Sequence, residues 1–111
     1  MPTLAGELQP HDQFHNQRAV LELTVNNHPG VMSHVCGLFS RRVFNVEGIL
    51  CMPVDGTPQS RIWLLVDEDR RLEQMMRQLL KLEDVLDVRR HGADHDVFLQ
   101  LEQFFRAGGR V

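Results

Sequence analysis

A chain of 111 residues is long enough for one small domain with short tails. Its content of 42% hydrophobic and 24% charged residues is ordinary for a globular protein. The net charge of −3, without a stripe of basic residues, argues against a nucleic-acid partner. No apolar run approaches the ~18 residues of a membrane span, and residues 1–17 lack the pattern of a secretory signal. Cys36 and Cys51 lie in apolar runs, as buried thiols of a reducing cytoplasm do, so we expect a cytoplasmic protein.

Residues 1–18 are polar and irregular, and we expect them to form a flexible N-terminal tail. The tail contains His11 and His15, whose spacing would suit a metal site on a helix. Nothing around them favours a helix, so solvated histidines are the preferred interpretation.

The first predicted strand covers residues 19–26, with Leu21, Leu23 and Val25 on one face. A helix is predicted over residues 31–43, because its apolar residues recur at helical spacing. The Met and Phe residues of this stripe are more typical of a core than of a cofactor site.

A second strand is predicted over residues 44–54, with Val46, Gly48, Leu50 and Met52 on one face. A glycine inside a strand indicates a bulge or the close approach of another group, so Gly48 predicts one of these. Residues 55–58 read Asp-Gly-Thr-Pro, which predicts a hairpin into the next strand.

The third predicted strand, residues 60–67, is apolar on both faces. One layer of helices covers only one face of a sheet, so Trp63 and Leu65 need a second cover. The C-terminal tail of the same chain and a partner protein are both open as that cover.

A helix over residues 69–81, a strand over 85–90 and a helix over 96–106 that ends at Gly108 and Gly109 complete the chain. The order β-α-β-β-α-β predicts an α+β, ferredoxin-like domain, whose four-stranded antiparallel sheet carries both helices on one face. We expect this domain over residues 19–91 and a helical tail over residues 92–111.

The turn between the first strand and the first helix, Asn27-His28-Pro29-Gly30, is the candidate binding site. Together with Val31 and Met32 it presents backbone N–H groups to an anion, because the first N–H groups of a helix lack internal partners. Gly30 allows a positive φ and close approach, Pro29 restricts the turn, and Asn27 offers a donor and an acceptor. The alternative is an ordinary strand-to-helix turn with an asparagine cap.

Catalytic motifs are absent from the sequence, including a nucleophile elbow, a phosphate loop and a dinucleotide fingerprint. Cys36 and Cys51 do not form a Cys-x-x-Cys pair, which weakens a metal-carrier interpretation. The sequence therefore favours binding and regulation over catalysis.

Several segments resemble the ACT domain of the small regulatory subunits of acetolactate synthase, over roughly residues 19–90. They are LELTVNNHPGVM (21–32), GLFSRR (37–42), FNVEGILC (44–51), IWLLV (62–66), RLEQM (71–75) and KLEDV (81–85). His28-Pro29 departs from the family, whose longer members have Glu-Ser or a similar pair in this turn.

The resemblance implies a non-catalytic subunit that binds and activates a catalytic large subunit and confers feedback inhibition by valine. It implies thiamine diphosphate, FAD and Mg²⁺ in that partner and no cofactor in this chain.

The resemblance also implies a homodimer of ACT domains with valine at the interface. The N–H groups of Gly30, Val31 and Met32 would hold the valine carboxylate, and Asn27 would orient the ligand.

From the second protomer, Asn45 and Val46 would complete this site. Trp63 and Leu65, with the tail helix, are the candidate surface for the catalytic subunit.

Three other interpretations stay open. One is a stand-alone ACT-type amino-acid sensor that acts on another target. A second is a ferredoxin-like metal carrier that uses Cys36, Cys51 and histidines. A third is a small enzyme, which the missing catalytic groups disfavour.

Overall fold

The computed structural model describes residues 17–107. Its elements are β1 (Arg18–Asn26), α2 (Val31–Arg41), β2 (Val46–Pro53), β3 (Gln59–Asp67), α3 (Leu72–Leu80), β4 (Val85–Gly92) and α4 (Asp96–Ala107). The predicted helices and strands are found in the predicted order, with ends that differ by up to three residues. The tail predicted over residues 1–18, with His11 and His15, lies outside the described residues except for its last two, as do Gly108 and Gly109.

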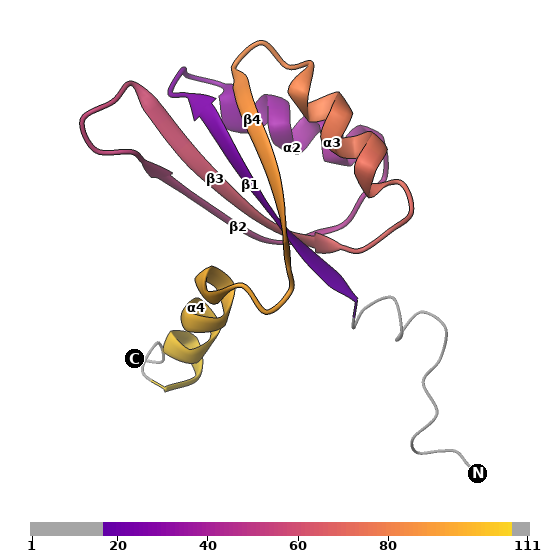
Figure 1. Ribbon diagram of the computed structural model, residues 1–111, viewed down its shortest axis with the longest axis vertical. Helices are drawn as coiled ribbons and strands as arrows, with labels where there is room; N and C mark the ends of the chain where they lie inside the picture. The colour runs from indigo at the N-terminus through magenta and orange to yellow at the C-terminus, as the bar shows by residue number, and fades with distance from the viewer. Residues whose placement is uncertain (1–16, 108–111) are drawn as a thin grey trace.

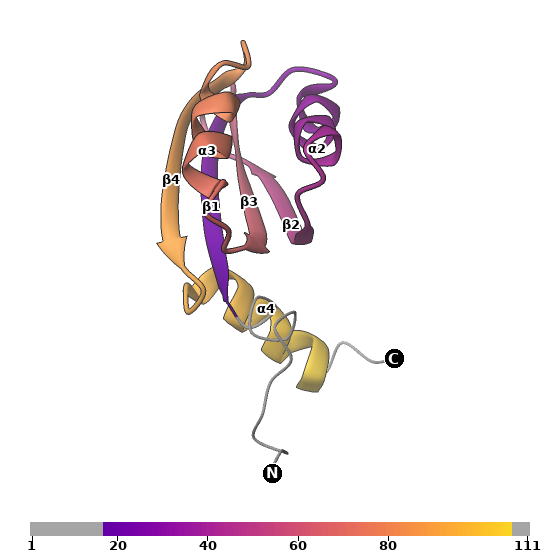
Figure 2. The ribbon, with the colours of Figure 1, turned by 90° about the vertical axis from the view of Figure 1, so that its right-hand side faces the viewer.

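The strands form one antiparallel sheet in the order β2-β3-β1-β4. Helices α2 and α3 lie together on one face of this sheet, and α4 lies apart from them (Figures 1 and 2). This arrangement confirms the predicted ferredoxin-like fold.

The core lies between the sheet and the helix pair. Each strand sends alternate side chains into it, so Leu21 of β1 sits opposite Leu64 of β3, and Leu23 sits opposite Ile62. The helices contribute their apolar stripes, and the residues buried there include Val35, Phe39, Leu72, Met75 and Leu79. Full burial of a side chain of this size contributes about 1.5–3 kcal/mol, so this face dominates the stability of the domain.

Helix α2 ends two residues before the predicted end, in a Schellman motif. The N–H of Phe44 donates to the carbonyl of Phe39 at 2.9 Å, and the N–H of Val43 donates to that of Ser40 at 3.1 Å. The motif places Val43 in the left-handed region, with φ 52°. It also turns Phe44 back into the core, edge-on to Phe39 with ring centroids 5.6 Å apart. The predicted strand 44–54 therefore begins only at Val46.

Helix α3 begins later than predicted because Asp69 and Arg71 form a local turn. The Asp69 carboxylate accepts the backbone N–H of Arg71 at 2.8 Å and its Nε at 3.2 Å. These hydrogen bonds hold the pKa of Asp69 below its usual range. The Arg71 guanidinium also stacks on the Phe44 ring, which links the start of α3 to the end of α2.

A bulge at Glu47 corrects the predicted alternation of β2. Val46 pairs with Val66 and Gly48 pairs with Leu65, so one extra residue lies between them. Val46 therefore lies on the helix-covered side, whereas the alternate residues from Gly48 to Met52 lie on the other. The bulge that Gly48 predicted is present.

Helix α4 packs on the outer face of the sheet, the face opposite α2 and α3. Phe98 is buried against Gly48, where an added Cβ would lie only 2.9 Å from Phe98 Cε1. Glycine at this position is what lets the aromatic ring approach the backbone. The first turns of α4 are thus seated closely on the sheet.

Candidate functional site

The turn after β1 is fixed by backbone hydrogen bonds to two other loops. The N–H of Asn26 donates to the carbonyl of Asp84 at 2.8 Å, and that of Asn27 donates to Pro58 at 3.0 Å. These acceptors come from the α3–β4 connection and from the β2–β3 hairpin. The turn therefore has a defined position relative to the sheet although Asn27 itself is exposed.

His28 is held within the protomer. Its ring Nδ1 lies 2.8 Å from Asp84 Oδ1, and its backbone N–H donates to the Asn26 carbonyl at 2.8 Å. Pro29 follows and is exposed. The ring of His28 therefore buttresses the turn through Asp84, and its Nδ1 is occupied within the protomer.

Gly30 caps α2 with φ 88°, the positive value that the sequence predicted it would permit. Apart from its two chain neighbours, no atom of residues 17–107 lies within 4 Å of the position where its Cβ would be. The first turn of α2 has no acidic side chain and no side-chain cap. The positive end of the helix dipole is thus left open to an anion.

Not all the N–H groups predicted to hold a carboxylate are available for it. Val31 donates its N–H to the carbonyl of His28 at 3.2 Å, inside the turn. Among residues 17–107, no backbone carbonyl accepts the N–H of Gly30 or of Met32. The side chain of Val31 belongs to the core and that of Met32 is half-buried. Gly30 and Met32 are therefore the donors that the turn offers.

Asn45 and Val46 lie at the other end of α2, about 16 Å away along the helix at 1.5 Å per residue. Asn45 is exposed, and its Nδ2 lies 3.4 Å from Glu47 Oε2. Both residues line a groove of about 270 Å³ between α2 and β2, together with Cys36 and Ile49. One protomer thus holds two separate halves of the predicted site.

Sequence reasoning missed Asp84, which contacts both Asn26 and His28. It also missed the part that Cys36 and Ile49 play in lining the groove. Asp84 is 58 residues from Asn26, so no local pattern reveals the contact. The predicted topology held the only signal, because β4 is the antiparallel neighbour of β1 and its first residues must lie beside the end of that strand.

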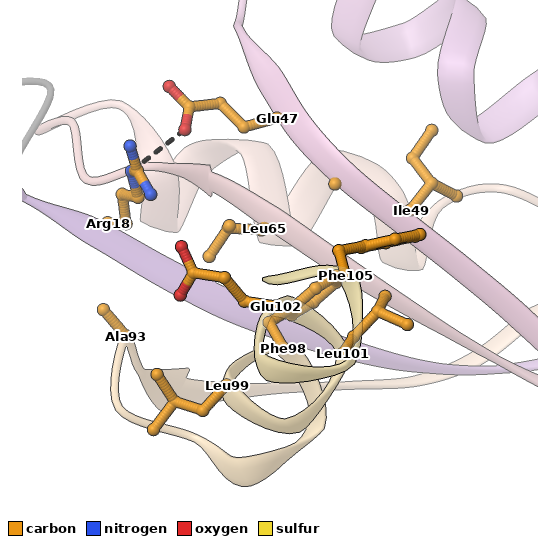
Figure 3. A pocket seen from close by; sticks show the side chains of 11 residues that line it. Arg18, Glu47, Ile49, Leu65, Ala93, Phe98, Leu99, Leu101, Glu102 and Phe105 are labelled. Atoms are coloured by element: carbon orange, nitrogen blue, oxygen red, sulfur yellow. Dashed lines mark ion pairs between the residues drawn. The ribbon is translucent and has the colours of Figure 1, made fainter. Parts of the chain in front are cut away.

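Trp63 and Leu65 lie on the outer face, where the C-terminal part of the chain covers them in part. Leu65 lines a pocket of about 560 Å³ with Phe98 (Figure 3). The Trp63 ring lies 4.9 Å from the His95 ring and 5.9 Å from the His91 ring, between centroids. Both residues stay half-buried, so the outer face is covered incompletely.

Two histidines hold this cover in place. His95 Nδ1 accepts the backbone N–H of Val97 at 3.2 Å and so caps the first turn of α4. His91 Nε2 lies 2.8 Å from Glu22 Oε1, and Glu22 also pairs with Arg61 at 3.2 Å. The His95 ring also lies 4.6 Å from the His91 ring, between centroids, so the residue that caps α4 contacts β3 through Trp63 and β4 through His91.

Across residues 17–107, no group of three or more His, Cys, Asp or Glu side chains is arranged to hold a metal ion. Cys36 on α2 is half-buried and Cys51 on β2 is exposed, so the expectation of two buried thiols is wrong. Partial burial raises the pKa of the Cys51 thiol. No helix within the same range is long and apolar enough to cross a membrane.

Comparisons of the sequence and of the fold with known proteins point to the same family. A family model described as an AHAS small subunit-like ACT domain matches residues 21–87. Over 91 residues, the chain is 57% identical to the acetolactate synthase isozyme 1 small subunit of Escherichia coli K12. This match covers 82% of this chain and 95% of that protein. It is 40% identical over 72 residues to the isozyme 3 small subunit of the same organism, covering 64% of this chain and 44% of that protein.

Among solved structures, the acetolactate synthase small subunit of Thermotoga maritima superposes with a TM-score of 0.62 at 27% identity. The superposition covers 81% of this chain and 68% of that one.

Proposed function

Since the chain belongs to the family of acetolactate synthase small subunits with an ACT domain, we propose that it is the regulatory subunit that binds and activates the catalytic large subunit. It also confers feedback inhibition by valine on branched-chain amino-acid synthesis in the cytoplasm. The observation that carries the proposal is that the likeness extends over nearly the whole E. coli isozyme 1 small subunit. In this proposal thiamine diphosphate, FAD and Mg²⁺ belong to the catalytic subunit.

The proposed valine site forms between two copies of this chain. Edge-to-edge pairing of β2 about a two-fold axis would bring the start of α2 in one copy beside the end of α2 in the other. The turn at Gly30 would then face Asn45 and Val46 of the second copy. The separation of these residues within one protomer supports a shared site.

In this site each part of valine has a complementary group. The N–H groups of Gly30 and Met32 would bind the carboxylate, with a helix-end contribution of about 0.3–1 kcal/mol. Asn27 would orient the ligand. The groove beside Val46 would accept the isopropyl group, whose burial contributes roughly 1.5–3 kcal/mol. Because two copies share the ligand, its binding biases their relative orientation, and a coupling of about 1–3 kcal/mol is enough for inhibition.

The first experiment is acetolactate formation by the cognate catalytic subunit, with and without this chain, across a valine titration. We expect higher activity with the chain and a fall as valine rises. No effect of the chain on activity, together with valine binding to the isolated chain, would instead favour a stand-alone amino-acid sensor.

A second experiment locates the site. Gly30→Asp places a carboxylate where the valine carboxylate would bind, and there is room for its side chain. We expect inhibition to be lost, because the two like charges repel each other. Gly30→Asn has nearly the same shape without the charge and carries the same backbone strain, so it should retain much more inhibition. Full valine sensitivity of Gly30→Asp would refute the site.

A further inference from the structure

The exposed edge of β2 has a defined length. The bulge at Glu47 interrupts regular pairing at one end, and Pro53, which has no N–H to donate, ends it at the other. The regular edge therefore runs from Gly48 to Met52, and its midpoint is Leu50. A strand that pairs with its own copy in antiparallel fashion is symmetric about such a midpoint.

Helix α4 crosses this edge. It begins beside β4, seats Phe98 on Gly48 and continues beyond β2 (Figure 2). Phe105 and Ile49 line the same pocket, from the helix and from the edge strand respectively (Figure 3). The last turns of α4 thus extend over the region that the sheet of a second copy would occupy if it paired with this edge.

Several large apolar side chains near this edge are left exposed in the protomer, and three of them are more than half exposed. Phe104 and Phe105 are 61% and 62% exposed, and their rings meet edge-on with centroids 5.8 Å apart. Met52, on the same outer face as Gly48, is 56% exposed. Exposed aromatic residues grouped in this way are typical of interaction surfaces.

Antiparallel pairing centred on Leu50 would place Met52 of the second copy next to Gly48. At that position α4 passes over the edge, so the uncovered rings on α4 and the uncovered Met52 would come together. We propose that α4 is a dimer clamp, in which Phe104 and Phe105 of each copy pack on Met52 and the adjoining β2–β3 hairpin of the other. This inference rests on the homodimer of the proposed function and adds the element that fastens it.

The chemistry of the two surfaces suits this contact. A thioether packs favourably against the edge of an aromatic ring, and methionine adapts to an irregular surface. The two-fold axis generates the contact twice, so each dimer would hold two clamps for one strand pair. A second copy is the occupant that the symmetric edge favours, because the same operation that pairs β2 also covers α4.

Cross-linking of single-cysteine variants tests the clamp. In the full chain with Cys36→Ser and Cys51→Ser, one preparation carries Met52→Cys and another carries Phe105→Cys. After mixing and subunit exchange, we expect a covalent heterodimer under mild oxidation or with a short bismaleimide. Met52→Cys mixed with Leu80→Cys is the matched control, because Leu80 is exposed on the helix-covered side of the sheet. It should give no such product.

A second measurement reports the contribution of the clamp to dimerisation. The double variant Phe104→Ala, Phe105→Ala should raise the dimer dissociation constant about tenfold or more, as loss of an aromatic anchor does. Leu86→Ala, an exposed leucine on β4, is the control and should leave it unchanged. Both are measured by sedimentation equilibrium.

The outcomes separate the clamp from the homodimer. Dimers that give no Met52–Phe105 cross-link, and whose dissociation constant the double variant does not change, would overturn the clamp while keeping the homodimer. A chain that stays monomeric at all concentrations would overturn both.

Discussion

The two faces of the sheet use the same strands in different ways. On the face under α2 and α3, side chains from β1 and β3 interdigitate with two helices, and those of Leu21, Ile62 and Leu64 have 1% exposure or less. On the outer face, α4 covers only part of the surface. There an ion pair between Glu22 and Arg61 and two histidine rings lie beside Leu65 and Trp63.

The helix-covered face therefore stabilises the fold, whereas the outer face is the surface that partners can reach. A closed apolar layer is sufficient for stability and offers nothing to recognise. A half-covered face with polar groups and exposed aromatic residues has a small stabilising role and an open surface. Neighbouring positions of one strand therefore belong to different functions, and substitutions at such positions test the distinction.

The largest effect is expected from a pair of adjacent leucines on β3. Leu64→Ala should lower the free energy of unfolding by about 2–5 kcal/mol, because it leaves a cavity in the closed layer. Leu65→Ala, on the outer face, should cost less than half as much. Urea denaturation monitored by circular dichroism measures both. Equal losses would show that the outer face is a second core.

A smaller effect is expected from crowding the seat of α4. Gly48→Ala places a methyl group against Phe98 and should cost about 1–3 kcal/mol, with faster amide exchange in α4 than in the core strands. Phe98→Leu alone is the control, and the two changes combined should cost less than their sum. If exchange rose equally in β1, α4 would not be a separately docked unit.

A stabilising substitution is expected in the connection between α2 and β2. Val43 is a β-branched residue in the left-handed region and is 85% exposed, so its side chain contributes strain and little packing. Val43→Gly should raise the free energy of unfolding by about 1 kcal/mol, measured by thermal and urea unfolding. Val43→Ala keeps a Cβ and should gain less. A loss of stability in Val43→Gly would contradict the assigned strain.

The smallest effect should come from the turn at the start of α3. Because Arg71 depresses the pKa of Asp69 in the folded chain, the contribution of this carboxylate is complete above its unfolded value near 3.9. It is lost as the pH falls through the lower folded value. Asp69→Asn should therefore be less stable than the parent at neutral pH, and the two should converge once the pH falls below the folded-state pKa of Asp69. A constant difference across this range would argue against the linkage.

The elements and their order follow from the sequence because period-2 and period-3.6 patterns are local. The end of α2 and the start of β2 do not, since both are set by the left-handed conformation of Val43, which turns Phe44 into the core. At Val43 the chain accepts strain to bury Phe44, whereas its β-branched side chain favours an extended conformation.

Some features of the candidate site likewise follow from the sequence and others do not. The positive φ of Gly30 follows from glycine next to proline at a helix start. The anchoring of His28 by Asp84 does not, because it depends on two loops that are distant in the sequence. The separation of Asn45 from the turn does follow from the sequence, because the helix predicted over residues 31–43 lies between them.

The stack of Trp63 on His95 gives the isolated chain a built-in optical reporter. Trp63 is the single tryptophan of the sequence, and it lies under the residue that caps α4. Lifting of α4 would change the polarity around this indole and therefore its emission, while the closed layer on the other side of the sheet stays intact. Movements of the C-terminal helix can thus be followed without a label, in the chain as it stands.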